Sequence, residues 1–298
     1  MLFTNSAQKL LAVSALIAAG CADSPPSADL PTSLKISDEI VMLSTDEGRN
    51  ISTRVLTPDG CMDCPLVIFS HGANAAYDRY DALVVPLAQA GYRVAIPNHT
   101  DSEDHFERAA YTPTDWLPTR VEDYNVIAEQ YDTSFRIAAG HSFGAMIAQI
   151  AGGAEMSSDI KIDPEYLPGA VLAYSPPGPI PNYIGSEGWS KIKVPSLITT
   201  GTKDIVPMMA DQWELHLASY EAAPLGTSFA LIYENMDHYM NGAYGRETQT
   251  STSERERALE HMISASVFFV SELRKDGRLS SEDWDTQEQN FVEARAGK

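Results

Sequence analysis

Apolar runs of strand length recur along the chain and are separated by stretches with helical spacing. Residues 36–43 and 50–57 predict an antiparallel pair of strands. Six further apolar runs predict strands in a covered sheet: 66–70, 92–96, 135–139, 170–174, 194–200 and 228–233. The hydrophobic spacing between and after these runs predicts helices at 80–88, 115–130, 207–220 and 259–273.

Strands and helices alternate from residue 66 onward, and this alternation predicts the fold class. It is typical of an α/β domain with a mostly parallel, doubly wound sheet covered by helices on both faces. We assign this domain to residues 36–275, and no segment is long enough for a large cap domain. The polar and charged residues 276–298 are expected to form a peripheral extension, with Trp284 and Phe291 as anchors.

The pentapeptide Gly140-His141-Ser142-Phe143-Gly144 lies between a predicted strand and a stretch with helical spacing. It matches Gly-x-Ser-x-Gly, the sharp turn that exposes a serine nucleophile above a sheet. The serine needs a strained backbone there, and side chains at the two glycines would collide with neighbouring elements. The sequence therefore predicts Ser142 as a nucleophile. The N–H of Phe143 would lie at a helix start and point at developing negative charge.

The first twenty residues differ from the rest of the chain. Lys9 is their only charged residue, and their apolar run is too short to span a bilayer, which predicts a signal peptide over 1–20. The end of this segment resembles a bacterial lipoprotein signal with lipidation at Cys21, although Ala18 replaces the usual leucine. A plain secretory signal is the alternative. Residues 21–35 are expected to form a flexible tether. Both alternatives predict export, either to the bacterial cell envelope or to the periplasm or medium.

The net charge and the cysteine content limit which binding partners, disulfides and metal sites are expected. The net charge of −20 argues against nucleic acid or an anionic membrane surface as a partner. With Cys21 lipidated, Cys61 and Cys64 remain as a pair, and a disulfide is the default for such a pair in an exported protein. No second Cys or His pair stands at zinc-ligand spacing, so we expect no metal and no cofactor.

The order of strand, nucleophile turn and helix resembles the α/β-hydrolase superfamily over roughly residues 36–275. The resemblance implies a triad in the order Ser, Asp or Glu, His. In that superfamily the acid usually ends the strand after next, and the histidine follows the last strand. Asp204 and His238 hold these positions. Glu234 is the second choice for the acid.

Two other histidines and one other acid are weaker candidates for the triad. His216 lies inside the predicted helix 207–220, and His261 lies among polar neighbours in the last helix, so both are expected at the surface. The carboxylate of Asp237 adjoins His238 in sequence and cannot easily reach back to orient that ring.

The implied triad assigns a role to each residue. His238 would take the proton of Ser142 and later give it to the leaving alcohol, while Asp204 would fix the tautomer of His238. The tetrahedral intermediate needs two hydrogen-bond donors. Phe143 would supply one N–H, and the turn after the strand 66–70 would supply the other, with Ala73 the first choice and Asn74 the second.

Within the superfamily, two segments are similar to the platelet-activating-factor acetylhydrolase and dienelactone-hydrolase branch. They are Phe69-Ser70-His71-Gly72 with the downstream Tyr80, and residues 92–99. Relatives of the acetylhydrolase place the acid one strand earlier, after Tyr174, where this chain has Ser175-Pro176-Pro177. The dienelactone enzymes use cysteine as the nucleophile. These departures leave the fold expectation intact and the substrate open.

The loop after the predicted strand 92–96 carries His99, Asp101, Asp104 and His105. We interpret it as a solvated loop. A substrate-contact loop and a metal site are the alternatives.

The resulting hypothesis is a serine carboxylester hydrolase that cleaves small esters with short to medium acyl groups through an acyl-enzyme. Tyr77, Trp189 and Met208 are predicted to line the acyl pocket. The alternatives are a non-catalytic exported binding protein with this fold, and a lipid or polyester hydrolase with the same mechanism. The sequence does not predict the oligomeric state.

Overall fold

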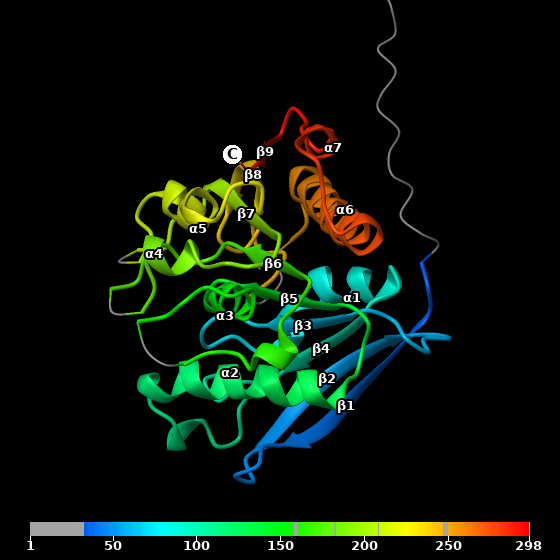
Figure 1. The fold of residues 1–298 in the computed structure, drawn as a ribbon, viewed down its shortest axis with the longest axis vertical. Coiled ribbons are helices and arrows are strands. Elements are labelled where there is room, and N and C mark those ends of the chain that lie inside the picture. The colour runs from blue at the N-terminus through cyan, green and yellow to red at the C-terminus, as the bar shows by residue number, and fades with distance from the viewer. Residues whose placement is uncertain (1–32, 158–159, 182, 208, 247–249, 298) are drawn as a thin grey trace, which may run out of the picture.

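The computed structural model describes residues 33–157, 160–181, 183–207, 209–246 and 250–297, which form one sheet flanked by helices (Figure 1). The strands are β1 (Ile36–Ser44), β2 (Asn50–Pro58), β3 (Leu66–Ser70), β4 (Arg93–Pro97), β5 (Arg136–His141), β6 (Ala170–Tyr174), β7 (Ser196–Lys203), β8 (Ser228–Asp237) and β9 (Val292–Ala296). The helices are α1 (Asp81–Gln89), α2 (Pro113–Gln130), α3 (Phe143–Ala151), α4 (Ser186–Trp189), α5 (Ala218–Ala222), α6 (Ser253–Asp276) and α7 (Ser281–Asp285). The expected signal peptide, Cys21 and most of the expected tether lie outside the described residues.

The sheet has the order β1-β2-β4-β3-β5-β6-β7-β8-β9 and is mostly parallel, which confirms the predicted fold class. The predicted antiparallel pair β1–β2 is present, and β2 also joins β4 in antiparallel register. Because parallel strands point the same way, the carboxyl ends of β3, β5, β7 and β8 meet at one edge of the sheet. The turns after these four strands carry Gly72, Ser142, Asp204 and His238.

Side chains of the buried strands alternate between two hydrophobic cores, one on each face of the sheet. Along β3, Val67 and Phe69 pack with α1 and α6, whereas Leu66 and Ile68 pack with α2 and α3. This alternation with a period of two explains why the central strands are apolar throughout. None of the helices in the described part of the chain has the length and apolar character needed to cross a membrane.

Two expectations from the sequence are wrong. The segment 207–220 is not one helix: Val206 and Ala210 form an isolated bridge, and a 3₁₀ helix at Trp213–Leu217 precedes the short α5. The tail, residues 276–298, is anchored through Trp284 and Phe291 as expected, but it is part of the sheet and not a peripheral extension. Trp284 is fully buried against the core, and β9 pairs antiparallel with β8 as a further strand of the sheet. Strand β9 therefore follows β8, which the sequence indicated as the last strand.

Candidate active site

Ser142 lies in the sharp turn between β5 and α3. Its backbone has φ 55° and ψ −120°, a strained conformation for a residue with a side chain. A Cβ at Gly144 would stand 1.9 Å from the carbonyl oxygen of Ser70, and one at Gly140 would stand 2.4 Å from the backbone of Gly144. Because the backbones approach this closely, only glycine fits at either flank, as the motif predicts.

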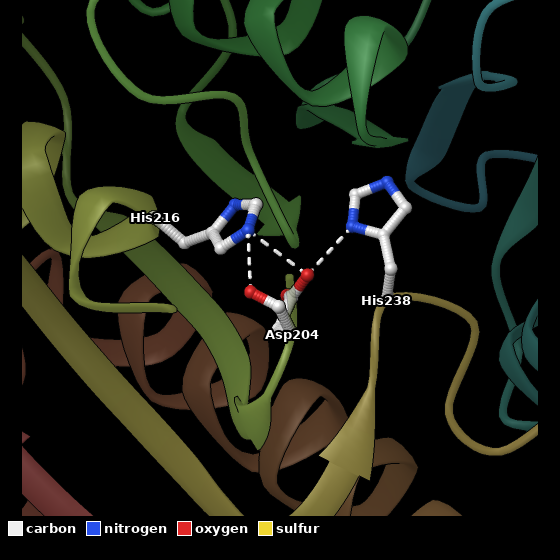
Figure 2. A group of neighbouring side chains, drawn as sticks. All are labelled: Asp204, His216 and His238. Atoms are coloured by element: carbon white, nitrogen blue, oxygen red, sulfur yellow. Dashed lines mark hydrogen bonds and ion pairs between the residues drawn. The ribbon is translucent and has the colours of Figure 1, made fainter. Parts of the chain in front are cut away.

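Asp204 and His238 form a hydrogen-bonded pair at the carboxyl ends of β7 and β8. Nδ1 of His238 lies 2.7 Å from Oδ1 of Asp204 (Figure 2). Thr200 donates its hydroxyl hydrogen to the other carboxylate oxygen at 2.9 Å. Burial alone would raise the pKa of Asp204, but hydrogen bonds from His216 and His238 outweigh it and hold that pKa well below its usual range. An ionised Asp204 fixes the hydrogen of His238 on Nδ1 and leaves Nε2 as the basic nitrogen.

A second imidazole, His216, contacts the same carboxylate from the opposite side (Figure 2). It is buried rather than exposed, which corrects the expectation from the sequence. Its Nε2 lies 2.9 Å from Oδ1 of Asp204, and its Nδ1 lies 2.6 Å from the carbonyl oxygen of Pro176. Both nitrogens of His216 are engaged, so His238 is the histidine of this group with a nitrogen available for chemistry. We call Asp204, His216 and His238 the acid cluster.

The acid cluster also consists of residue types that bind metal ions, and its possible ligand atoms all lie within 4.8 Å of one another. The distances between these nitrogen and oxygen atoms fit hydrogen bonds better than a bound metal ion. Nitrogen and oxygen ligands bind zinc at about 2.0–2.2 Å, which separates two ligand atoms on one ion by about 3 Å or more. The contacts of Asp204 with His238 and His216 are 2.7 and 2.9 Å.

A chain of hydrogen bonds connects the turns on which the candidate catalytic residues lie. His238 offers its carbonyl oxygen to Nε2 of His141 at 2.8 Å, so that nitrogen carries a hydrogen. Burial lowers the pKa of His141 well below its usual value, so its Nδ1 is an acceptor, and Tyr80 donates to it at 3.0 Å. The Tyr80 oxygen in turn accepts the N–H of Gly72 at 2.8 Å. The turns after β3, β5 and β8 are thus held in a fixed arrangement.

The two predicted oxyanion donors are free to bind a ligand. Neither the N–H of Ala73 nor that of Phe143 donates to a residue in the described part of the chain. Asn74, the second choice, is excluded because its N–H donates to Oδ2 of Asp101 at 2.9 Å. A Cβ added at Gly72 would stand 3.5 Å from Cβ of Ser142, so the Ala73 turn lies beside Ser142.

Beneath this turn lies a fully buried ion pair between Arg120 and Asp101. Arg120 donates from Nε and Nη2 to the two carboxylate oxygens at 2.8 Å each, and from Nη1 to the carbonyl oxygen of His71 at 2.5 Å. Its guanidinium also lies over the ring of Phe143, 4.7 Å from the centroid. We call Arg120 and Asp101 the oxyanion clamp, because they contact the residues on both sides of the predicted oxyanion hole.

The clamp corrects the interpretation of residues 99–105 as a solvated loop. Asp104 is exposed, but His99 and Asp101 are fully buried and His105 is also buried. His99 contacts the hydroxyl of Ser70 at 2.8 Å and the carboxylate of Asp123 at 2.7 Å. These hydrogen bonds hold the loop in place and satisfy its buried imidazole, as is usual for buried polar groups.

The structure agrees only in part with the residues predicted to line the acyl pocket. Trp189 is fully buried and donates its indole N–H to Gln149 at 3.0 Å, so it belongs to the core and not to a pocket surface. Tyr77 is half-buried and packs against the core. Met208 lies outside the described residues, while the neighbouring Ile205 and Met209 are exposed and apolar.

The remaining sequence-based assignments can be compared with the structure in part. Cys61 and Cys64 form a disulfide, as predicted. His261 is buried and contacts the Tyr233 hydroxyl at 3.0 Å, so it is not a surface residue. One signal for the clamp was available, because Arg120 stands on the apolar face that also carries Leu117 and Val121. Nothing in the sequence indicates the contact between His216 and Asp204.

Comparisons with known proteins agree with this architecture. The family model described as "Platelet-activating factor acetylhydrolase, isoform II" matches residues 42–118, a minority of the chain. A comparison with curated proteins finds no match. Among solved structures, a protein described as a dienelactone hydrolase from Klebsiella pneumoniae subsp. pneumoniae has a TM-score of 0.57 at 15% identity, covering 77% of this chain and 98% of that one.

Two larger hydrolytic enzymes share the same core. A puromycin hydrolase has a TM-score of 0.56 at 15% identity, and an acylaminoacyl peptidase from Pyrococcus horikoshii has 0.55 at 14%. They cover 82% and 79% of this chain, which spans only 40% and 42% of theirs. At these identities the likeness concerns the fold. Together with the sheet order and the nucleophile turn, it shows that this chain has the α/β-hydrolase fold.

Proposed function

We propose that this protein is a serine hydrolase that cleaves carboxylic esters with Ser142, His238 and Asp204 as its triad. The proposal is carried by the hydrogen bond between Nδ1 of His238 and Asp204, which leaves Nε2 of His238 as a base. His238 lies at the same edge of the sheet as Ser142, whose backbone is strained. The hydrolases and peptidases of the same fold support this reaction class.

The mechanism follows from the protonation states. Nε2 of His238 takes the hydroxyl proton of Ser142 as the Ser142 oxygen attacks the carbonyl carbon of the ester. The electrons of the C=O double bond move onto the carbonyl oxygen. The N–H groups of Phe143 and Ala73 stabilise this oxyanion. Collapse expels the alcohol, which receives the proton from His238 and leaves an acyl-Ser142. Water then attacks the acyl group, His238 accepts its proton, and the acid is released as Ser142 recovers its hydrogen.

We further propose short to medium acyl groups for the substrate. The name of the matching family refers to an acetyl ester, and the exposed apolar residues beside Asp204 suit small apolar groups. Each methylene that fits would add at most about 0.8 kcal/mol of binding. Hydrolysis of acetyl to hexanoyl esters is expected, with a steep fall beyond about ten carbons. A specificity constant that still rises at palmitoyl esters would favour a lipid hydrolase.

The test is labelling by a fluorophosphonate probe combined with ester hydrolysis. The wild-type protein should be labelled and active, and Ser142→Ala should lose both while its circular dichroism is unchanged. Retention of more than a small fraction of turnover in Ser142→Ala would refute the nucleophile. A wild-type protein that neither reacts with the probe nor hydrolyses any ester would instead favour a binding protein.

Export, with a lipid anchor at Cys21, is also a proposal. The disulfide between Cys61 and Cys64 supports an oxidising compartment. Mass spectrometry of the mature protein under non-reducing conditions should find the two thiols joined and an acylated Cys21 at the new N-terminus. Two free thiols would contradict export, and an unmodified mature chain would favour the plain secretory signal.

A further inference from the structure

The hydrogen-bond partners of His216 determine how many hydrogens its ring carries. Nδ1 lies 2.6 Å from the carbonyl oxygen of Pro176. Nε2 lies 2.9 Å from a carboxylate oxygen of Asp204 and 3.1 Å from the carbonyl oxygen of the same residue. Carbonyl oxygens accept hydrogen bonds and never donate them, so each ring nitrogen needs its own hydrogen. A neutral imidazole has one hydrogen and would leave one nitrogen lone pair facing a lone pair of oxygen.

The extra proton could instead be assigned to Asp204, and the surroundings of that carboxylate argue against it. The carboxylate also accepts hydrogen bonds from Nδ1 of His238 and from the hydroxyl of Thr200, and each of these bonds favours the ionised form. A proton on the carboxylate would also leave Nε2 of His216 unprotonated against the carbonyl oxygen of Asp204. The arrangement therefore fits an imidazolium against a carboxylate.

We propose that His216 is a positively charged positioning residue that holds and neutralises the Asp204 carboxylate, and thereby sets the pH below which His238 stops acting as a base. This inference rests on the proposed function, because His238 is the base there. The centroids of the two imidazole rings are 5.5 Å apart, so a charge on one acts directly on the other. An uncompensated carboxylate would favour protonated His238, and the imidazolium of His216 cancels much of that attraction.

The groups around His216 agree with a charged ring. Burial would lower the pKa of His216, but the hydrogen bond and the negative charge of Asp204 outweigh burial and raise this pKa. Two further imidazoles interact with this ring, His238 and the neutral His141. Tyr244 interacts with Asp204, and burial raises the pKa of this phenol well above its usual value. Asp204 is thus the charge that counterbalances the imidazolium.

The kinetic test compares two substitutions that each remove one hydrogen bond to Asp204. His216→Gln removes a charge together with a contact, whereas Thr200→Val removes only a neutral donor to the other carboxylate oxygen. In His216→Gln the acid limb of the kcat/KM profile for a short ester should move to higher pH by about 0.5 to 2 units. Coulomb's law gives this range for one charge at 5.5 Å with effective dielectric constants of about 80 to 20. Thr200→Val should leave the limb in place.

A limb that moves equally in both variants, or in neither, would overturn the proposal and leave His216 with a merely structural role. A direct measurement covers the case in which His216→Gln does not fold. In the ¹⁵N-labelled wild-type protein at pH 7, both ring nitrogens of His216 should give protonated signals. The His216→Gln or, if needed, His216→Asn spectrum assigns them by their loss. An unprotonated Nε2 at pH 7 would overturn the proposal.

Failure of this inference can be distinguished from failure of the proposed function. The nitrogen signals report the protonation of His216 whether or not the protein is an enzyme. If Ser142→Ala kept its turnover, the proposed function would fail while a charged His216 could still be observed. If Ser142→Ala were inactive and Nε2 of His216 were unprotonated, only the inference drawn here would fail.

Discussion

The two sides of the candidate site each depend on a buried ion pair, and the pairs differ in their cation. On the oxyanion side, the clamp joins Arg120 to Asp101, both fully buried. On the acid side, His216 contacts Asp204 at similar depth. A guanidinium stays charged at any pH that a folded protein tolerates, whereas an imidazole titrates near neutral pH. The predicted donors for an oxyanion are therefore held independently of pH, while the environment of the proposed base, His238, responds to pH.

The residues of the clamp also make more contacts than the pair of His216 and Asp204. Arg120 contacts both oxygens of Asp101, the carbonyl oxygen of His71 and the ring of Phe143. Burial alone would raise the pKa of Asp101, but the charge and hydrogen bonds of Arg120 hold it well below its usual range. Its Oδ2 then accepts the N–H of Asn74 and leaves the N–H of Ala73 for a ligand. Rigid positioning of donors is what stabilises an oxyanion without reorganisation.

Removing the charge on the acid side should have the largest effect on turnover. In Asp204→Asn the amide no longer fixes the hydrogen of His238 on Nδ1, and kcat should fall by about 10⁴-fold, as is typical for a triad acid. Steady-state kinetics on a short ester measures this loss. The control is Glu234→Gln, the same chemical change at an exposed acid, which should keep kcat within about tenfold. An equal loss in the control would contradict the assignment of Asp204.

Breaking the clamp should have the next largest effect. Arg120→Met leaves Asp101 buried without its cation, which typically costs about 3–5 kcal/mol. Urea unfolding at pH 8 should show this loss, and at lower pH protonation of the unpaired Asp101 carboxylate should reduce it. The control, Arg54→Met, removes a cation whose partners Asp38 and Asp81 are exposed, so its cost should be nearer 1 kcal/mol. Equal losses in the two variants would contradict a special role for the clamp.

A double substitution separates stability from positioning at the clamp. Arg120→Met combined with Asp101→Leu removes both charges, which typically restores much of the stability that the single change loses. It does not restore the acceptor for the Asn74 N–H or the donor to the His71 carbonyl. We expect kcat to stay low in the double variant. Recovery of full turnover would show that the clamp stabilises the fold without shaping the oxyanion hole.

The same two sides differ in how far the sequence predicts them. The strand runs and the Gly140–Gly144 turn predict the sheet and Ser142, because local backbone geometry and burial on both faces dictate those residues. Asp204 and His238 follow from their places after strands in a known fold. The failure at 207–220 has a physical cause. Apolar spacing alone does not distinguish one helix from short turns whose side chains point inward, and one such turn brings His216 to Asp204.

The buried polar contacts of the candidate site could not be predicted from the sequence. His99 and Asp101 occur in a hydrophilic stretch that is typical of an exposed loop, and only tertiary contacts with Arg120 and Asp123 bury them. Trp189 illustrates the reverse error, because an aromatic residue near a Pro/Gly-rich loop fits a pocket wall as well as a core. Long-range pairing decides both cases, and it has no local signature.

Tyr80 links the two sides, and removing its hydroxyl should have an intermediate effect. Tyr80→Phe leaves the N–H of Gly72 and Nδ1 of His141 without their partner, at a cost of about 1–3 kcal/mol. Turnover should fall together with stability, because the turns before Ala73 and Ser142 lose their common contact. The matched control is Tyr92→Phe, whose hydroxyl contacts Ser271 outside the site and should cost stability without lowering kcat. Unchanged kcat in Tyr80→Phe would contradict the coupling.

The smallest expected effect concerns stability against pH, and it isolates the titrating cation of the acid side. The folded pKa of His216 is raised above its usual 6.5, so its contribution to stability is fully present below pH 6.5 and is lost as pH rises through the folded value. Other buried histidines have lowered pKa values and act in the opposite sense, on the acid side of pH 6.5. The difference in unfolding free energy between wild type and His216→Gln removes their effect. Urea unfolding from pH 6 to 9 should show this difference falling above pH 6.5 by at most about 1.4 kcal/mol per unit, the slope for one proton. A difference that is flat over this range would mean that His216 does not release a proton there and would remove the contrast with the clamp.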